Sequence, residues 1–191
     1  MEQRTPAWYE WRSRGIGGSD APIIMGVSKY MTVQELWEEK VYGKKRDQTF
    51  PQQVGIDMES EAMAHLQLLI DEDLYPETFE HQTHSFLRFS SDGWSFSKKI
   101  LAEVKCCGQA DHETALSGLV PKHYIPQVQH GAMICNPEKI LYFSYYGNYS
   151  KTKRYEQRGK IIEVKPDLEY QKELLEKELW FWDCVVNKKK P

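Results

Sequence analysis

Hydrophobic residues in the first third of the chain recur every three or four positions, which is the spacing of an amphipathic helix. Met58, Ala62, Leu66 and Leu69 follow this spacing and predict a long helix over Gln53 to Ile70. Beyond residue 70 the period shortens toward two, which is the spacing of strands. The chain is therefore expected to change there from helices to mixed structure.

Three short helices are expected before the long one, because each has a recognisable start or stop. A Thr5-Pro6 pair supplies a cap and a first-turn proline for the first helix. Ala21 to Met25 form a second, very short helix. The sequence Thr-Val-Gln-Glu over Thr32 to Glu35 is a capping box that begins the third helix, which ends at Gly43.

Segments rich in β-branched and aromatic residues predict two pairs of strands in the middle of the chain. The first pair is Thr78 to Phe89 and Lys99 to Cys106, with Asp92 in the turn between them. The second pair is Lys139 to Tyr146 and Arg158 to Val164, joined by a polar loop.

Two more helices complete the pattern, one over Tyr124 to Ile134 and one over Leu168 to Val186. The residues expected to face inward on the last helix are Tyr170, Leu174, Leu175, Leu179, Trp182 and Val186. The order of helices, strands, helix, strands and helix indicates an α/β fold with a mixed central sheet flanked by helices. We expect a single domain over residues 1–191.

Composition supports a folded domain, since 40% of the 191 residues are hydrophobic and 13% are aromatic. A net charge of −3 gives no overall attraction to nucleic acid, so DNA contact would need a local basic patch. The absence of C-x-x-C pairs, of a signal peptide and of an 18-residue apolar span favours a soluble cytoplasmic protein without membrane contact. The basic clusters available are Arg12 and Arg14, Lys29, Lys44 to Arg46, Lys98 and Lys99, and Lys151 to Arg154.

The most informative chemistry lies between Ser90 and Lys105, where an aspartate precedes a Glu-x-Lys strand. Side chains alternate along a strand, so Glu103 and Lys105 share one face while Val104 turns to the other. Carboxylates of Asp92 and Glu103 are hard-oxygen ligands of the kind that Mg²⁺ prefers. This arrangement suits metal-assisted phosphodiester cleavage, although Asp-Gly turns and exposed Glu-x-Lys strands are common without any function.

A second Glu-x-Lys, Glu163 to Lys165, serves as an internal control. No aspartate occurs in the dozen residues before it, so we interpret this copy as structural. The glycine-rich turn Gly15 to Asp20 matches neither a dinucleotide nor a P-loop fingerprint. Ser19 or Asp20 in it would cap the second helix, and its amide groups could bind a single phosphate.

Five segments in this order resemble the lambda-type exonucleases, also called YqaJ-like viral recombinases or alkaline exonucleases. They are Arg12 to Ala21, Gly55 to Ala62, Ser90 to Gly93, Glu103 to Cys106 and Tyr124 to Gln129. The resemblance implies a restriction-endonuclease-like, PD-(D/E)xK fold. It further implies Mg²⁺-dependent 5′-to-3′ digestion of one strand of linear duplex DNA, which leaves a 3′ overhang for a phage single-strand annealing protein. It also implies a homotrimeric ring around DNA.

Site residues carried over from the resemblance fall into two groups. The implied catalytic residues are Asp92, Glu103, Lys105, Glu59 and Gln127, and the residues expected to hold two Mg²⁺ ions, replaceable by Mn²⁺, are Asp92, Glu103, Val104 and Glu59. The implied pocket for a 5′-terminal phosphate is formed by Arg12, Ser19 and Ser90.

Three of these assignments have a close neighbour of the same type, so Glu61, Arg14 and Gln129 are the alternatives to Glu59, Arg12 and Gln127. Two other functions fit the same residues. One is a sequence-specific endonuclease of this fold, and the other is a DNA-end-binding module without turnover.

Overall fold

A computed structural model describes residues 1–43, 50–147 and 158–191. The basic clusters Lys44 to Arg46 and Lys151 to Arg154 lie outside the described residues, as does most of the polar loop between the last two strands. No helix in the described ranges combines the length and the apolar character needed to cross a membrane.

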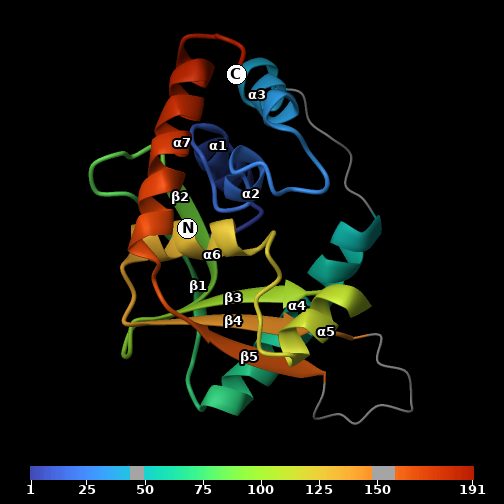
Figure 1. Ribbon diagram of the computed structural model, residues 1–191. Helices are drawn as coiled ribbons and strands as arrows, with labels where there is room; N and C mark the ends of the chain where they lie inside the picture. The colour runs from blue at the N-terminus through green and yellow to red at the C-terminus, as the bar shows by residue number, and fades with distance from the viewer. Residues whose placement is uncertain (44–49, 148–157) are drawn as a thin grey trace.

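A five-stranded mixed sheet forms the centre of the molecule, as predicted (Figure 1). The strands lie in sequence order, and only β3 and β4 run parallel, while the other neighbours are antiparallel. The strands are β1 (Tyr75–Glu80), β2 (Arg88–Ser95), β3 (Ile100–Cys106), β4 (Lys139–Tyr145) and β5 (Gly159–Val164). The parallel pair needs a crossover connection, and α5 and α6 provide it.

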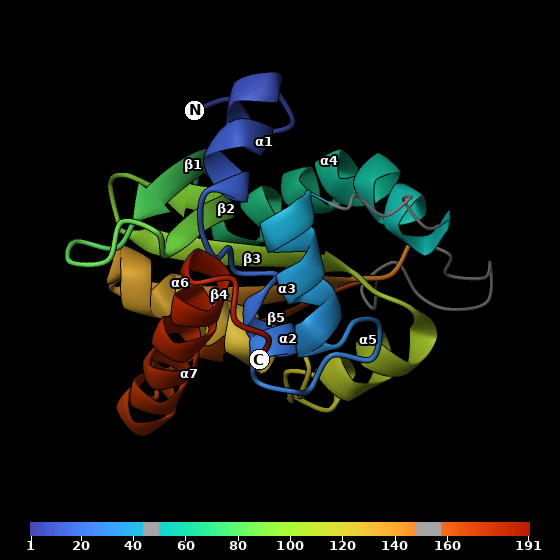
Figure 2. The ribbon, with the colours of Figure 1, turned by 90° about the horizontal axis from the view of Figure 1, so that it is seen from above.

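Helices cover both faces of this sheet, as Figure 2 shows, with α4 on one side of β3 and α6 on the other. The helices are α1 (Pro6–Ser13), α2 (Ala21–Ile24), α3 (Val33–Tyr42), α4 (Phe50–Ile70), α5 (Gln109–Leu116), α6 (Ile125–Cys135) and α7 (Leu168–Val186). Ala62 and Leu66 of α4 pack against Ala102 and Phe143 of the sheet. The opposite face belongs to a larger core that includes Val128 of α6.

Local sequence signals placed the short helices well. Thr5 Oγ1 accepts a hydrogen bond from the backbone N–H of Trp8 (3.3 Å), and the Thr32 and Glu35 capping box is complete. Gly43 ends α3 in a left-handed conformation (φ 67°). Asp20 occupies the cap position of α2, but its side chain makes no capping hydrogen bond, because it turns into the interior instead.

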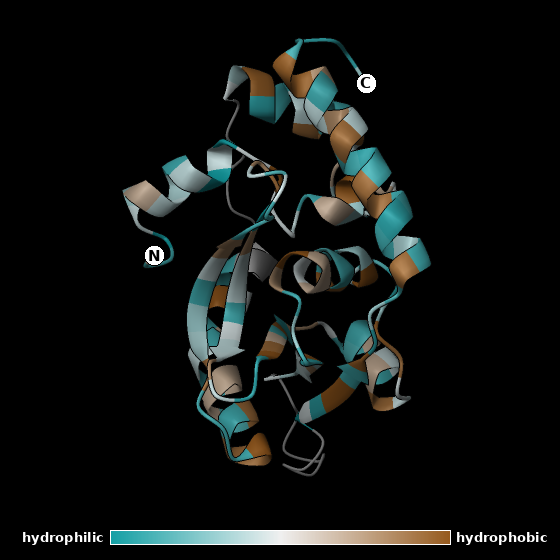
Figure 3. Cartoon of the chain, turned by 90° about the vertical axis from the view of Figure 1, so that its left-hand side faces the viewer, coloured by the Kyte–Doolittle hydropathy of each residue, from teal (hydrophilic) through white to brown (hydrophobic). Residues whose placement is uncertain are grey.

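Most of the two predicted stripes faces the core, since Ala62, Leu66 and Leu174 are buried, but one predicted position on each helix is exposed. Leu69 of α4 is 53% exposed and Val186 of α7 is 63% exposed, although both were expected to face inward. The buried positions of α7 are Gln171, Leu174, Glu178, Phe181 and Cys184. Polar and apolar bands alternate along this helix (Figure 3). Two of its inward positions, Gln171 and Glu178, carry polar side chains, which only tertiary partners can satisfy.

The prediction that Asp92 lies in a turn is wrong. The expected strand Thr78 to Phe89 is divided between β1 and β2, and Asp92 lies inside β2. The turn before β3 is formed by Phe96 to Lys99. Gly93 belongs to the strand and pairs with Ala102, and a Cβ there would lie 2.9 Å from the Cβ of Leu74, so a small residue is needed for packing.

Candidate active site

Asp92 and Glu103 lie where strands β2 and β3 separate. The last paired residues of the ladder are Gly93 and Ala102, so Asp92 and Glu103 are the next residues on each strand. Beyond that pair, the backbone N–H of Val104 donates a hydrogen bond to Oδ2 of Asp92 (2.8 Å). The aspartate therefore takes a hydrogen bond at the point where the ladder ends, and this holds its carboxylate beside β3.

Glu103 is the centre of a small polar cluster. Nζ of Lys105 lies 2.5 Å from Oε1 of Glu103, so the two side chains share one face of β3 as expected. Nε2 of Gln127, in the first turn of α6, donates to the same oxygen (2.5 Å). The ammonium of Lys105 also lies 5.5 Å from the ring centroid of Tyr124. Segments from β3 and α6 thus converge on one carboxylate.

Burial and like charge both act on the ionisation of this cluster. Burial, followed by the negative charge of Glu103, raises the pKa of Asp92 to about 8. The charge of Glu59 makes a smaller contribution to the same increase in the Asp92 pKa. Burial acts to lower the pKa of Lys105, but the carboxylates of Glu103 and Asp92 outweigh it and raise that pKa above its usual value.

The donor set fits a hard divalent cation. Glu103 is 1% exposed, and its Oε2 has no hydrogen-bond partner among the described residues. A buried carboxylate oxygen without a partner is costly unless a ligand or cation satisfies it. The side chain of Val104 is buried, so this residue could contribute only its backbone. Within the described ranges, no three His, Cys, Asp or Glu side chains form a ready metal cage.

The geometry distinguishes two of the paired alternatives. Glu59 is electrostatically linked to Asp92, whereas Glu61 accepts a hydrogen bond from the Tyr145 hydroxyl (2.5 Å). Gln127 contacts Glu103, whereas Gln129 is buried and donates to the Lys165 carbonyl (3.0 Å). Gln127 therefore reaches the cluster around Glu103 and Glu59 pairs with Arg4, whereas Glu61 and Gln129 make structural contacts.

The three residues of the expected phosphate pocket are brought together by Trp8, which sequence reasoning did not identify. Arg12 donates to the hydroxyl of Ser19, and its guanidinium lies 5.0 Å from the ring centroid of Trp8. The Trp8 indole N–H donates to Ser90 Oγ (3.0 Å). Arg14, in contrast, pairs with Glu10 on the exposed side of α1.

A buried ion pair fixes the turn that carries Ser19. Nζ of Lys40 lies 2.7 Å from Oδ2 of Asp20 and donates to the Gly15 carbonyl (2.8 Å), while the Gly17 N–H donates to the same Asp20 oxygen (2.9 Å). The charges of Lys40 and Arg12 keep the pKa of Asp20 low against the effect of burial. The turn is thus tied to α3.

The same turn lies directly against Phe89 of β2 and Gln127 of α6. A Cβ at Gly18 would lie 2.7 Å from the ring of Phe89 and 3.3 Å from Cγ of Gln127. Only glycine allows this approach, which places the phosphate pocket next to the residues around Glu103.

Lys40, Trp8 and Arg4 were not predicted as contacts of the site, and the sequence indicates them with unequal clarity. Lys40 follows Leu36 and Trp37 on the apolar stripe of α3, and a charge on such a stripe indicates a buried partner. Trp8 precedes Arg12 by one helical turn, which favours contact between them. Arg4, which pairs with Glu59, lies outside every predicted element, and no sequence pattern indicated it.

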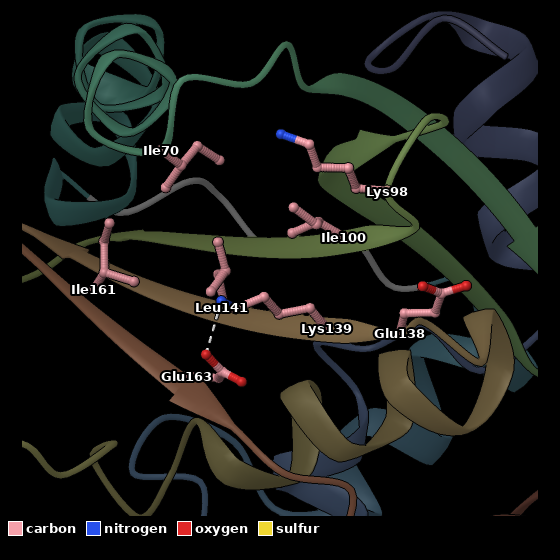
Figure 4. Close-up of a pocket in the computed structure, with 8 residues that line it drawn as sticks. All are labelled: Ile70, Lys98, Ile100, Glu138, Lys139, Leu141, Ile161 and Glu163. Carbon is pink, nitrogen blue, oxygen red and sulfur yellow. Dashed lines mark ion pairs between the residues drawn. The ribbon is translucent and has the colours of Figure 1, made fainter.

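A groove of about 680 Å³ lies at the opposite end of β3 and β4 (Figure 4). Its walls include Ile100, Leu141 and Ile161, and none of the predicted site residues lines it. Glu163 of the second Glu-x-Lys is at its edge, 2.8 Å from Nζ of Lys139. This position agrees with a structural interpretation of the second copy.

Comparison with known proteins identifies relatives of this fold. Residues 7–138 match the YqaJ-like viral recombinase domain. The uncharacterized protein YqaJ of Bacillus subtilis (strain 168) is 26% identical over 203 residues, and the alignment covers 97% of this chain but 57% of that protein. The chain thus spans little more than half the length of this curated relative.

Solved structures give the same result for the fold. The alkaline exonuclease LHK-Exo from Laribacter hongkongensis aligns with a TM-score of 0.82 at 19% identity, over 97% of this chain and 94% of that one. Its complex with dAMP gives 0.83 at the same identity and coverage. A phage-related exonuclease from Haemophilus somnus 129PT gives 0.66 at 14% identity, over 91% and 96%. These matches confirm the restriction-endonuclease-like fold.

Proposed function

The chain belongs to the YqaJ-like viral recombinase family, and on this premise we propose that it is a metal-dependent deoxyribonuclease. In this proposal it digests one strand of linear duplex DNA from the 5′ end and leaves a 3′ overhang. The similar structures carry exonuclease names, and one of them contains dAMP, a deoxynucleoside monophosphate of the kind such digestion releases.

The observation that carries the proposal is the convergence of Asp92, Glu103 and Lys105 at the end of the β2 and β3 ladder. Two carboxylates and an ammonium at one point, with a buried carboxylate oxygen left without a partner, are hard to explain as a solvated surface. A structural role would leave these charges paired and satisfied.

Each side chain has a distinct task in this proposal. Asp92 and Glu103 would hold a divalent cation such as Mg²⁺, with Glu59 near a second position. Such a cation supplies a Lewis acid at the phosphate and lowers the pKa of bound water. Lys105 offers three N–H donors to negative oxygens of the reacting phosphate. Gln127 keeps the Glu103 carboxylate oriented through its amide.

The direction of digestion would follow from the pocket formed by Arg12, Ser19 and Ser90. A guanidinium and hydroxyl groups are suitable partners for a terminal phosphate. Ser90 precedes Asp92 by two residues on the same strand, so a phosphate bound there would fix the next phosphodiester over the carboxylates. An anchored 5′ end would therefore raise turnover as well as binding.

The proposal includes assembly and partners suggested by the family resemblance. We expect a homotrimeric ring that encloses DNA and a phage single-strand annealing protein that receives the 3′ overhang. Light scattering on the purified protein measures the first, and a binding assay with a purified phage single-strand annealing protein measures the second.

One gel assay tests the central proposal. Linear duplexes with a 5′ phosphate or a 5′ hydroxyl, each labelled at one 3′ end, are incubated with the protein in Mg²⁺ or in chelator beside closed circular DNA. On linear DNA in Mg²⁺, and not in chelator, we expect each strand that carries a 5′ phosphate to be digested from that end. Slower digestion is expected from the 5′ hydroxyl, and none on circles.

The other outcomes identify the alternatives. Cleavage of closed circles at fixed positions would indicate a sequence-specific endonuclease. Binding to DNA ends without any cleavage in Mg²⁺ or Mn²⁺ would indicate an end-binding module. Activity in excess chelator would contradict the metal-dependent proposal.

A further inference from the structure

The first five residues lie against the strand that carries Asp92. Nε2 of Gln3 donates to the backbone carbonyl of Ser91 (2.8 Å), and the N-terminal ammonium lies 3.8 Å from Glu77 of β1. Thr5 then begins α1. Between these contacts, Arg4 adopts a left-handed backbone conformation (φ 63°), which residues with a side chain seldom take. The segment is therefore anchored on both sides of Arg4.

Arg4 makes its side-chain contact with Glu59. Its Nη2 forms an ion pair with Oε2 of Glu59, a residue on α4 that is 55 positions away in the sequence. The side chains are 44% and 31% exposed. Glu59 is the carboxylate expected near a second cation, and its charge acts on Asp92. An arginine thus lies on a carboxylate of the proposed active site.

We propose that Arg4 is a built-in counter-cation for Glu59, which competes with the second divalent cation. This inference rests on the proposed function. While this pair persists, the guanidinium occupies Oε2 of Glu59 and its positive charge repels a divalent ion at the same carboxylate, so the second cation binds more weakly. The first cation, held by Asp92 and Glu103, does not meet this competition, because neither of these residues contacts Arg4 through a hydrogen bond or ion pair within the described residues.

Competition of this kind is readily reversible. Exposed ion pairs contribute little to stability, so Arg4 can be displaced by a cation at moderate concentration. The expected effect on the affinity of the second cation is therefore modest, about threefold to fivefold. In the free protein, Arg4 would thus delay binding of the second cation at Glu59 until the cation is abundant.

Titration of the DNA-free protein with Mn²⁺, followed by calorimetry and by electron paramagnetic resonance, tests this role. The wild type is expected to bind one Mn²⁺ more tightly and a second more weakly. In Arg4→Ala the second binding step should tighten about threefold to fivefold, with the first step unchanged. Arg4→Lys keeps a cation and should stay close to the wild type. Because both side chains are partly exposed, these variants should fold, which thermal unfolding in chelator verifies.

Two further variants identify the source of any change. Lys177→Ala removes one positive charge from an exposed pair with Glu173 on α7, and it should leave both steps unchanged. Glu59→Gln should lose the second step, and Arg4→Ala combined with Glu59→Gln should show no gain over it. An unchanged or weaker second step in Arg4→Ala, or a gain that survives Glu59→Gln, would overturn the inference. If the wild type binds no Mn²⁺ at all, the metal-dependent function fails instead.

Discussion

The two carboxylates of the site allow a sharp prediction at the level of single residues. Asp92→Asn and Glu103→Gln keep the shape of each side chain but remove its charge. We expect turnover on linear duplex DNA to fall by more than about a hundredfold, since changing even the partners of metal ligands costs about 10- to 100-fold. For Asp92→Asn the metal-free protein should unfold in urea at the same or a higher midpoint, because burial and the charge of Glu103 oppose ionisation of the Asp92 carboxyl.

Lys105→Met serves as the companion of these variants. It removes the ammonium but no carboxylate, so cation binding should persist while turnover falls by about 10² to 10³. Wild-type rates in Asp92→Asn or in Lys105→Met would show that the assigned residues are not the catalytic ones.

Gln127 and Gln129 form a matched pair on one helix and predict opposite results. Gln127→Ala removes a contact with Glu103 and should lower turnover with little change in the free energy of unfolding. Gln129→Ala removes the partner of three groups, namely the partly buried Lys165 carbonyl and Asp167 N–H and the buried Gln171 amide.

Gln129→Ala should therefore destabilise the protein by about 1–3 kcal/mol while the folded fraction keeps its turnover. Urea unfolding and a rate measured per folded molecule separate the two effects. The reverse result would mean that the second glutamine, and not the first, belongs to the site.

At the level of elements, the ion pair between Lys40 of α3 and Asp20 supports the turn that carries Ser19. Lys40→Met removes one partner of a buried pair and should destabilise the protein by about 3–5 kcal/mol. The combination with Asp20→Asn should recover part of this loss, because no charge is then left buried without a partner.

The same variants predict a change in end preference. When the Lys40 contacts to Gly15 and Asp20 are lost, the turn no longer holds Ser19 beside Arg12, so the ratio of rates on 5′-phosphate and 5′-hydroxyl ends should shrink. A conservative variant, Lys40→Arg, tests whether charge alone is sufficient. An unchanged ratio in folded Lys40→Met would mean that the turn is positioned by other contacts.

The elements differ in how well the sequence predicted them, and local signals explain the difference. Thr5, Thr32 and Gly43 act within one turn of their own helices, so α1 and α3 could be identified from residues nearby. Helix α5 was not predicted, since its sequence shows almost no amphipathic pattern. Asp92 lies within β2 because the residues on either side of it, Ser91 and Gly93, pair with β1 and β3, and no local pattern indicates such pairing.

The site follows the same rule. The Glu103 and Lys105 pair could be predicted, because strand alternation alone places both on one face. Gln127 contacts a residue 24 positions away, Lys40 one 25 positions away and Trp8 one 82 positions away. No local sequence pattern specifies contacts at such separations. Family resemblance supplied Gln127, whereas Trp8 and Lys40 required the three-dimensional structure.

At the level of the whole molecule, α7 is joined to the catalytic side through a fully buried pair. Nδ1 of His130 on α6 lies 2.7 Å from Oε1 of Glu178 on α7, and its Nε2 lies 3.0 Å from the Arg88 carbonyl of β2. Both side chains of the pair are 0% exposed. One imidazole therefore connects the last helix, the helix that begins near Gln127 and the strand that carries Asp92.

The charge of this imidazole depends on its neighbours. Burial acts to lower the pKa of His130, but the carboxylate of Glu178, with smaller help from the Arg88 carbonyl and Asp20, raises it above the usual value. The nearby His81 has a lowered pKa, mainly through burial, so its pKa moves in the opposite direction to that of His130. The stability that His130 contributes is thus fully present below about pH 6.5. It is lost as pH rises through the raised pKa.

Glu178→Gln should reverse this dependence on pH. The amide can still accept a hydrogen bond from His130, but the charge that did most to raise the imidazole pKa is gone, so burial outweighs the smaller help from the Arg88 carbonyl and Asp20 and the neutral form is favoured. The variant should therefore lose stability as pH falls below about 6.5, because His130 then binds a proton in the unfolded chain but not in the folded protein.

Urea unfolding of both proteins in chelator between pH 5 and 9 measures the difference. We expect Glu178→Gln to be less stable than the wild type by about 3 kcal/mol or more at acidic pH, the loss typical of a broken buried pair, and by much less at alkaline pH. His81→Gln, which removes a neighbouring imidazole without a Glu178 hydrogen bond, provides the control and should leave this slope in place. A difference between wild type and Glu178→Gln that is the same at every pH would show that His130 is neutral in the folded protein, and that α7 is held by packing and a neutral hydrogen bond alone.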